Sequence, residues 1–226
     1  IERGRLQRHP WSVAGGGAAD LMDAIARHSN GTLKTLIRSC GRTAHTGADE
    51  AYIADLAALR RRAIPAVHSA CFVEGERLRD WTLIEPTHAV FPYTEALEVM
   101  PDVPDDPTIR WLWPFRSMLW ERREPQGTHR EIGFTWHQYS RFHPERFPGS
   151  GIAFAFVGTH NHFVFDDGGK VFKQSAPVLK LRPDALDDDY MALLGVLRWR
   201  EEPTVLASVT GARRNSVGGA IWSTGS

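Results

Sequence analysis

The sequence lacks several features that would place a protein in a class at once. No run of apolar residues approaches the ~20 that a helix needs to cross a bilayer, and no signal peptide is apparent. Lysine and arginine number 27, as do aspartate and glutamate, so the formal net charge is +0. Any binding of an anionic partner must therefore come from local clusters of charge. We expect a cytoplasmic protein without membrane contact.

Cysteine is also scarce, since Cys40 and Cys71 are the two in the chain and have no Cys-x-x-Cys spacing. A structural zinc site wants four ligands, and a secreted scaffold wants more bridges. We interpret them as two small buried thiols in a reducing compartment.

Cofactor and nucleophile motifs are missing as well. There is no Gly-x-Gly-x-x-Gly after a strand, no Walker loop and no Gly-x-Ser-x-Gly elbow. The run Gly15-Gly16-Gly17 precedes a helical pattern, but no hydrophobic strand precedes the run. The sequence therefore predicts no cofactor bound by this chain.

What is present suits one globular domain with extra pieces at its ends, in a chain of 226 residues of which 42% are hydrophobic. Residues 1–40 are interpreted as a connector with a short amphipathic helix. The chain begins with Ile1 rather than Met, which suggests a piece of a longer protein. Residues 41–197 hold most of the regular structure. Residues 198–226 have few apolar residues in any period and are expected to be a disordered tail without assigned function.

The central part is predicted to be α+β, with a dominant antiparallel sheet and flanking helices. Alternation and β-branched residues favour short strands at 66–73, 81–84, 89–91, 152–157, 162–165, 170–173 and 178–181. Asp166-Asp167-Gly168-Gly169 lies between two of these runs and predicts a β-hairpin.

Two helices are expected beside these strands. Pro114 suits a first helical turn, and Phe115, Met118 and Leu119 would share one face. The second helix follows Asp187-Asp188-Asp189, which provides an N-cap and a negative first turn. Its apolar positions are Tyr190, Leu193, Leu194 and Leu197.

The most informative stretch runs from Leu119 to Phe142 and interleaves arginines, histidines and aromatic rings. Cations that meet phosphate and flat rings that stack are what a nucleic-acid surface requires. The alternative is a solvated Arg/Glu helix followed by a strand with core aromatics. The stretch alone does not decide between them.

A second candidate is Thr159-His160-Asn161-His162. Alternate residues of a strand share a face, so His160 and His162 could bind one metal ion if a third ligand joined them. Candidates for that ligand are His129, His137 and His143. The same polar side chains could instead read base edges or form ordinary hydrogen bonds at a strand end.

Taken in order, several motifs resemble a known family. They are His9-Pro10-Trp11-Ser12, Thr46–Ala51, Val73–Trp81, Phe91-Pro92-Tyr93, Leu112–Phe115, the stretch from Leu119 through Pro144, Thr159–Phe163 and Val171–Val178. Over residues 1–197 the chain resembles the region after the catalytic domain in adenine-specific DNA methyltransferases of the Eco57I-like and BREX (Pgl phage-growth-limitation) type. That region grips duplex DNA and reads the target site.

The resemblance implies a non-catalytic DNA target-recognition domain of a phage-defence or restriction-modification enzyme. Residues 1–40 would then connect to an upstream methyltransferase domain, 41–197 would be the recognition domain and 198–226 a divergent tail. Expected DNA-binding residues are Arg116, Arg122, Arg123, Arg130, Arg141 and Arg146, mainly toward phosphates, and Thr135, Trp136, His137, Thr159, His160, Asn161 and His162 toward the groove. The partners would be double-stranded DNA, the upstream domain and other phage-defence proteins.

The chain also departs from the family. No Asn-Pro-Pro-aromatic motif occurs, so we expect no methylation by this chain alone, and S-adenosylmethionine is implied only for the parent enzyme. After Leu197 the family continues Asn-Ser-Ser, whereas this chain reads Arg198-Trp199-Arg200. Two other hypotheses stay open: a metal-dependent hydrolase-like or ligand-binding β domain around His160 and His162, and a protein-interaction module of the defence complex.

Overall fold

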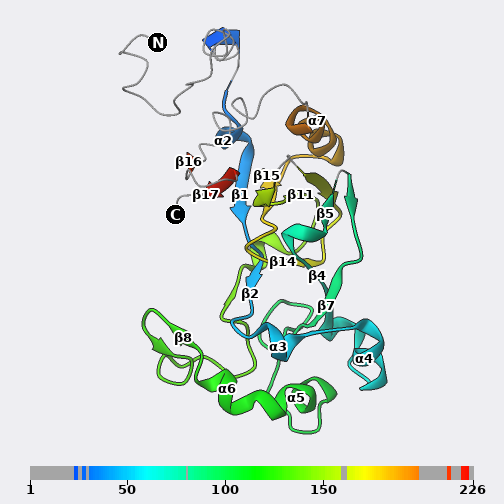
Figure 1. The fold of residues 1–226 in the computed structure, drawn as a ribbon, viewed down its shortest axis with the longest axis vertical. Coiled ribbons are helices and arrows are strands. Elements are labelled where there is room, and N and C mark those ends of the chain that lie inside the picture. The colour runs from blue at the N-terminus through cyan, green and yellow to red at the C-terminus, as the bar shows by residue number, and fades with distance from the viewer. Residues whose placement is uncertain are drawn as a thin grey trace.

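A computed structural model describes residues 23–24, 27–28, 31–79, 81–158, 162–198, 213–214 and 220–223, the last two ranges as backbone strands only. The described chain is elongated, with sheets in its middle and helices toward both ends (Figure 1). Most of the connector helix expected before residue 31 lies outside the described residues.

The first sheet has the order β1-β15-β11-β13, and each neighbouring pair is antiparallel. Its strands are β1 (Ile37–Gly41), β15 (Val178–Leu181), β11 (Gly151–Phe154) and β13 (Phe163–Asp166). The short helix α2 (Leu33–Leu36) precedes β1, which pairs with β15 in this sheet. The boundary expected between the connector and the recognition domain, at residues 40 and 41, therefore falls at the end of a strand of the sheet.

Helix α7 (Asp187–Arg198) packs on the first sheet and confirms the predicted helix. Three aspartates occupy its first turn, as expected. Tyr190, Leu194 and Leu197 are buried against the sheet. The hydroxyl of Tyr190 accepts a hydrogen bond from the amide of Leu181 at 2.9 Å, which ties the helix to β15.

The second sheet has the order β14-β4-β7-β3, with strands β14 (Lys170–Phe172), β4 (Ser69–Val73), β7 (Thr87–Val90) and β3 (Ile53–Ala54). Only β14 and β4 run parallel among these pairs. Val73 and Phe172 from this sheet share a core cluster with Val164 and Val178 from the first. The α+β class with mostly antiparallel strands is confirmed.

The predicted hairpin across Asp166–Gly169 is wrong, although both of its strands exist. Strand β13 pairs with β11, whereas β14 pairs with β4 in the other sheet. The glycines at 168 and 169 have φ of 98° and 71°, and Gly169 donates to the carbonyl of Phe147 at 2.9 Å. An Asp/Gly turn allows a sharp change of direction, but distant partners decide which sheet the next strand joins.

The remaining part contains α3 (Asp49–Tyr52), α4 (Leu56–Arg61), α5 (Pro107–Leu112), η4 (Trp113–Phe115) and α6 (Arg116–Trp120), with the ladders β2 (Ala44–His45)–β10 (Arg141–Phe142) and β8 (Arg123–Glu124)–β9 (Gly127–Thr128). An aromatic core joins them, in which Tyr52 and Tyr139 meet edge to face at 5.0 Å. The face predicted after Pro114 is correct for Leu119, which is fully buried, and wrong for Met118, which is exposed.

Shorter elements complete the described chain: η2 (Ala66–His68), η3 (Gly75–Arg77), β5 (Leu78–Arg79), β6 (Thr82–Leu83), η5 (Pro144–Arg146), β12 (Val157–Gly158), β16 (Arg213–Arg214) and β17 (Ala220–Ser223). Because β17 pairs with β12, part of the tail expected to lack structure is a strand. Within the described residues, no helix has the length and apolar character needed to span a bilayer.

Candidate nucleic-acid interface

Arg122 lies at the centre of the basic aromatic stretch, and its side chain is buried with 7% exposure. Its Nε donates to the carbonyl of Leu119 at 3.0 Å, and Nη1 donates to the carbonyl of Thr46. Nη2 donates to the carbonyls of Trp136 and Gln138, both at 2.8 Å. One guanidinium thus joins three separate segments through backbone carbonyls. The carbonyls of Thr46 and Gln138 also accept from the Ser140 amide and the Tyr52 hydroxyl, at 3.3 and 3.2 Å.

This burial corrects the phosphate-binding role expected for Arg122. All three of its nitrogens are engaged within the protein, and burial is the main reason that its pKa is lowered. A phosphate could reach it only if the surrounding segments came apart. Arg122 therefore supports the surface from within.

His129 and Ser140 lie beside Arg122 in an arrangement that resembles a nucleophile–base pair. Nε2 of His129 is 3.2 Å from the Ser140 hydroxyl, and Nδ1 is 3.2 Å from Nη2 of Arg122. Nη2 has two N–H groups and donates to the carbonyls of Trp136 and Gln138 at shorter distances, so Nδ1 is a third, shared acceptor. Burial, followed by the charge of Arg122, lowers the pKa of His129 to about 4. Both side chains are buried, His129 with 0% and Ser140 with 5% exposure, so no substrate reaches the hydroxyl and the pair is structural.

Trp136 and His137 are also inside the protein, with 1% and 0% exposure. The indole Nε1 of Trp136 donates to Asp102 at 2.8 Å. Nε2 of His137 lies 2.8 Å from the carbonyl of Met100 and is therefore the protonated nitrogen. Because both side chains are buried, they cannot reach a DNA groove from the surface, which argues against the groove-reading role expected for them.

The cations that do gather at a surface are Arg42, Arg141 and Arg146, called here the arginine cluster. The β2–β10 ladder creates it, because Arg141 pairs in register with His45, just after Arg42. Arg146 reaches the same place by donating from Nη1 to the carbonyl of Arg42 at 2.8 Å. The side chain of Arg141 is 45% exposed and pairs with Glu124 at 3.1 Å.

The pKa shifts around the cluster show that its charges are close to one another. Burial lowers the pKa of Arg42, and the charges of Arg141 and Arg146 lower it further. The pKa of His45 and that of His143 are lowered by burial and then by these arginines. Both imidazoles are therefore neutral at neutral pH, while the three guanidiniums keep their charges.

The other expected residues lie at different places around this region. Arg123 and Arg130 are exposed, and the guanidinium of Arg130 lies 5.3 Å from the ring centre of Trp120. Arg116 is half-buried and stacks over Trp113 at 4.8 Å. Thr135 is exposed, and its amide and hydroxyl both donate to the side chain of Gln138 at 3.0 Å.

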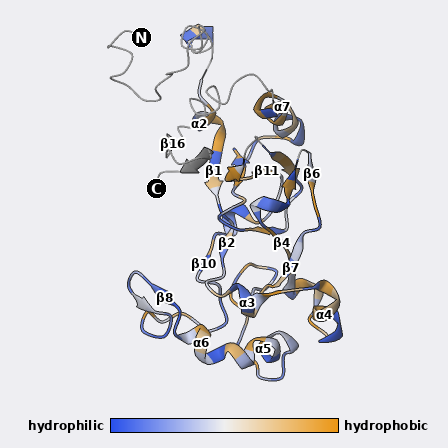
Figure 2. Ribbon diagram, viewed as in Figure 1, coloured by the Kyte–Doolittle hydropathy of each residue, from blue (hydrophilic) through white to orange (hydrophobic). Residues whose placement is uncertain are grey.

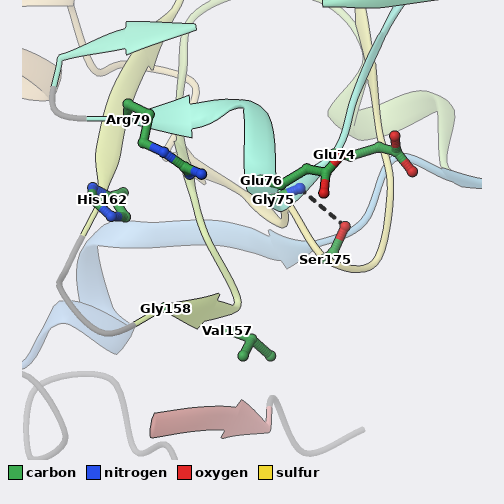
Figure 3. A pocket seen from close by; sticks show the side chains of 8 residues that line it. All are labelled: Glu74, Gly75, Glu76, Arg79, Val157, Gly158, His162 and Ser175. Carbon is green, nitrogen blue, oxygen red and sulfur yellow. Dashed lines mark hydrogen bonds between the residues drawn. The ribbon is translucent and has the colours of Figure 1, made fainter. Parts of the chain in front are cut away.

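Of the second candidate motif, Thr159, His160 and Asn161 lie outside the described residues. His162 is half-buried and lines a cavity of about 520 Å³ with Glu74, Gly75, Glu76, Arg79, Val157, Gly158 and Ser175 (Figure 3). Acidic and basic groups are mixed there. Among the described residues, no three histidine, cysteine or carboxylate side chains are grouped as a metal site would need.

Sequence reasoning missed Arg42, which is about a hundred positions before Arg141 and has no basic aromatic context. Only the pairing of β2 with β10 brings the two together.

Cys40 and Cys71 are free and half-buried, and burial raises the pKa of each thiol to about 11.

No family model matches the chain. The chain is 30% identical over 194 residues to the adenine-specific methyltransferase PglX of Streptomyces coelicolor. This alignment covers 85% of the chain but only 16% of PglX, so the chain corresponds to a small part of that protein. Among solved structures, the Type IIL restriction-modification enzyme MmeI in complex with DNA matches with a TM-score of 0.49 and 11% identity, over 75% of this chain and 22% of that one. Over most of its length, then, the chain is similar to a segment of a Pgl-type adenine-specific methyltransferase, which confirms the resemblance indicated by its motifs.

Proposed function

We propose that this chain is the DNA target-recognition part of an adenine-specific DNA methyltransferase of a phage-defence or restriction-modification system. It would hold duplex DNA for methyl transfer in a separate domain that binds S-adenosylmethionine. The similarity to PglX supports the parent class, and the cytoplasm is the compartment expected for such an enzyme. The observation that carries the DNA contact is the arginine cluster at the β2–β10 ladder.

The cluster suits phosphate for electrostatic and geometric reasons. Guanidinium groups bind phosphate through two parallel hydrogen bonds and stay charged at any physiological pH. Three of them close together repel one another, and a phosphate relieves this repulsion. Two carboxylates face the three guanidiniums: Glu124 pairs with Arg141, and Glu145 lies 3.6 Å from Nε of Arg146. The cluster therefore keeps an excess of positive charge.

Arg123 and Arg130 extend the proposed contact beyond the cluster. Both are exposed, and neither forms an ion pair with a described residue. Thr135 remains a candidate near the groove. Phosphate contacts of this kind fix the position of the protein on DNA, whereas the sequence must be read by other side chains.

Binding of the chain to a labelled random-sequence duplex at several salt concentrations tests the proposal. Each phosphate contact contributes about one unit to the slope of log K against log salt. Arg141→Ala should therefore weaken binding and flatten the slope by about one. Lys34→Ala changes an exposed cation of helix α2, which lies well apart from β2 in Figure 1; it serves as the control and should leave the slope unchanged. Absence of duplex binding by the unaltered chain would overturn the proposal.

A further inference from the structure

The β8–β9 hairpin is a small ribbon that stands away from the body of the molecule at the lower left of Figure 1. Arg123 pairs with Thr128 and Glu124 pairs with Gly127, so Pro125 and Gln126 form its two-residue tip. Both tip residues are exposed, and the segment is coloured mainly hydrophilic in Figure 2. An antiparallel ribbon of two strands has the dimensions that enter the major groove of B-DNA.

The base of the hairpin is fixed by hydrogen bonds on both strands. Before β8, the buried Arg122 holds this stretch to two other segments, at Thr46 and at residues 136–138. Its carbonyl accepts from the amide of His129 at 2.9 Å. After β9, the carboxylate of Glu131 accepts from the amide and hydroxyl of Thr128 at 2.8 and 2.9 Å. A side chain can report base identity only when its support is rigid, and this hairpin provides such a support.

The amide of Gln126 differs from those of the other two described glutamines. The side chain of Gln138 accepts from Thr135, and that of Gln174 accepts from Arg42 at 2.6 Å. Gln126 forms no side-chain hydrogen bond with a described residue, although its amide has two donors and an acceptor. The tip therefore presents an uncommitted amide to solvent.

Cations surround the base of the hairpin and leave its tip neutral. Arg123 starts the ribbon, Arg130 follows it, and both are exposed. Glu124, whose side chain is 9% exposed, is held by Arg141 and so does not face the groove. Phosphates at the groove edges would meet the cations, while the tip would reach the base edges.

We infer that the β8–β9 hairpin reads the major groove and that Gln126 recognises an adenine. The inference rests on the proposed function. A glutamine amide donates to N7 and accepts from the N6 amino group of adenine, a two-pronged contact that guanine does not offer.

Selection of bound duplexes from a randomised library, followed by sequencing, tests the inference. The unaltered chain should enrich adenine at one position or more. Gln126→Ala should reduce the preference at one position by roughly ten- to a hundredfold, with an unchanged salt slope because no phosphate contact is lost. Gln126→Glu keeps the shape without the donor and should favour cytosine there.

Glu95→Gln, which puts an exposed amide elsewhere, is the control and should retain the preference of the unaltered chain. Duplex binding with a preference that Gln126→Ala leaves intact would overturn the inference alone, as would binding by the unaltered chain with no base preference. Failure of the unaltered chain to bind any duplex would overturn the proposed function as well.

Discussion

Two neighbouring arginines show how differently the same residue type is used in this molecule. Arg122 is 7% exposed and gives its donors to backbone carbonyls, whereas Arg123 is exposed at the start of the β8–β9 hairpin. Arg122 belongs to a buried hub with His129 and Ser140. Arg123 belongs to the exposed cationic surface. Within a basic stretch, burial decides which charge stabilises the fold and which is available to a partner.

The largest expected effect comes from removing the centre of the hub. Arg122→Ala removes four hydrogen bonds to backbone carbonyls, those of Leu119, Thr46, Trp136 and Gln138. The carbonyls of Thr46 and Gln138 keep a second donor, while a buried carbonyl left unpaired costs about 1–3 kcal/mol. We expect a loss of about 3–5 kcal/mol in the free energy of unfolding, measured by urea denaturation. Arg123→Ala is the matched control and should change it by no more than about 0.5 kcal/mol. Equal midpoints for the two variants would contradict the distinction between hub and surface.

An effect of intermediate size is expected from pH, because the hub keeps His129 neutral. Its pKa is about 4 in the folded chain against 6.5 as the ordinary value. Between these values the unfolded chain binds more protons, so stability rises with pH across this window and is level above it. This group should contribute on the order of 3 kcal/mol across the window. The difference in unfolding free energy between the unaltered chain and His129→Gln should therefore depend on pH below 6.5, and a constant difference would contradict it.

A smaller effect is expected at the surface. The double variant Arg123→Ala/Arg130→Ala should lose no more than about 1 kcal/mol of stability, because neither side chain forms an ion pair with a described residue and Arg130 loses only its contact with Trp120. Its binding to duplex DNA should weaken, with a slope of log K against log salt flatter by about two. If only stability changed, both arginines would belong to the scaffold instead.

The sequence predicted some parts of this arrangement well. The aspartates before Tyr190 define α7, and alternation gives β11, β13, β14 and β15 to within a few residues. Such local signals are strong because capping and strand periodicity depend on neighbouring residues. The pairing of β13 and β14 was predicted wrongly because their partners, β11 and β4, lie elsewhere in the chain.

The candidate site shows the same limit. The stretch from 119 to 142 contains both the hub and part of the surface, and nothing local separates Arg122 from Arg123. Burial of Arg122 depends on Thr46, and the arginine cluster depends on Arg42, both far away in sequence. Composition therefore identified the region, while long-range packing assigned the individual side chains.

The most direct test of the account is the salt dependence of duplex binding by the double variant Arg42→Ala/Arg141→Ala, set against Lys34→Ala/Arg61→Ala as a double control of equal charge. The account predicts a slope of log K against log salt flatter by about two for the first variant and an unchanged slope for the control. Equal slopes for the unaltered chain and Arg42→Ala/Arg141→Ala, with both proteins folded, would contradict the proposal that the arginine cluster binds DNA phosphates.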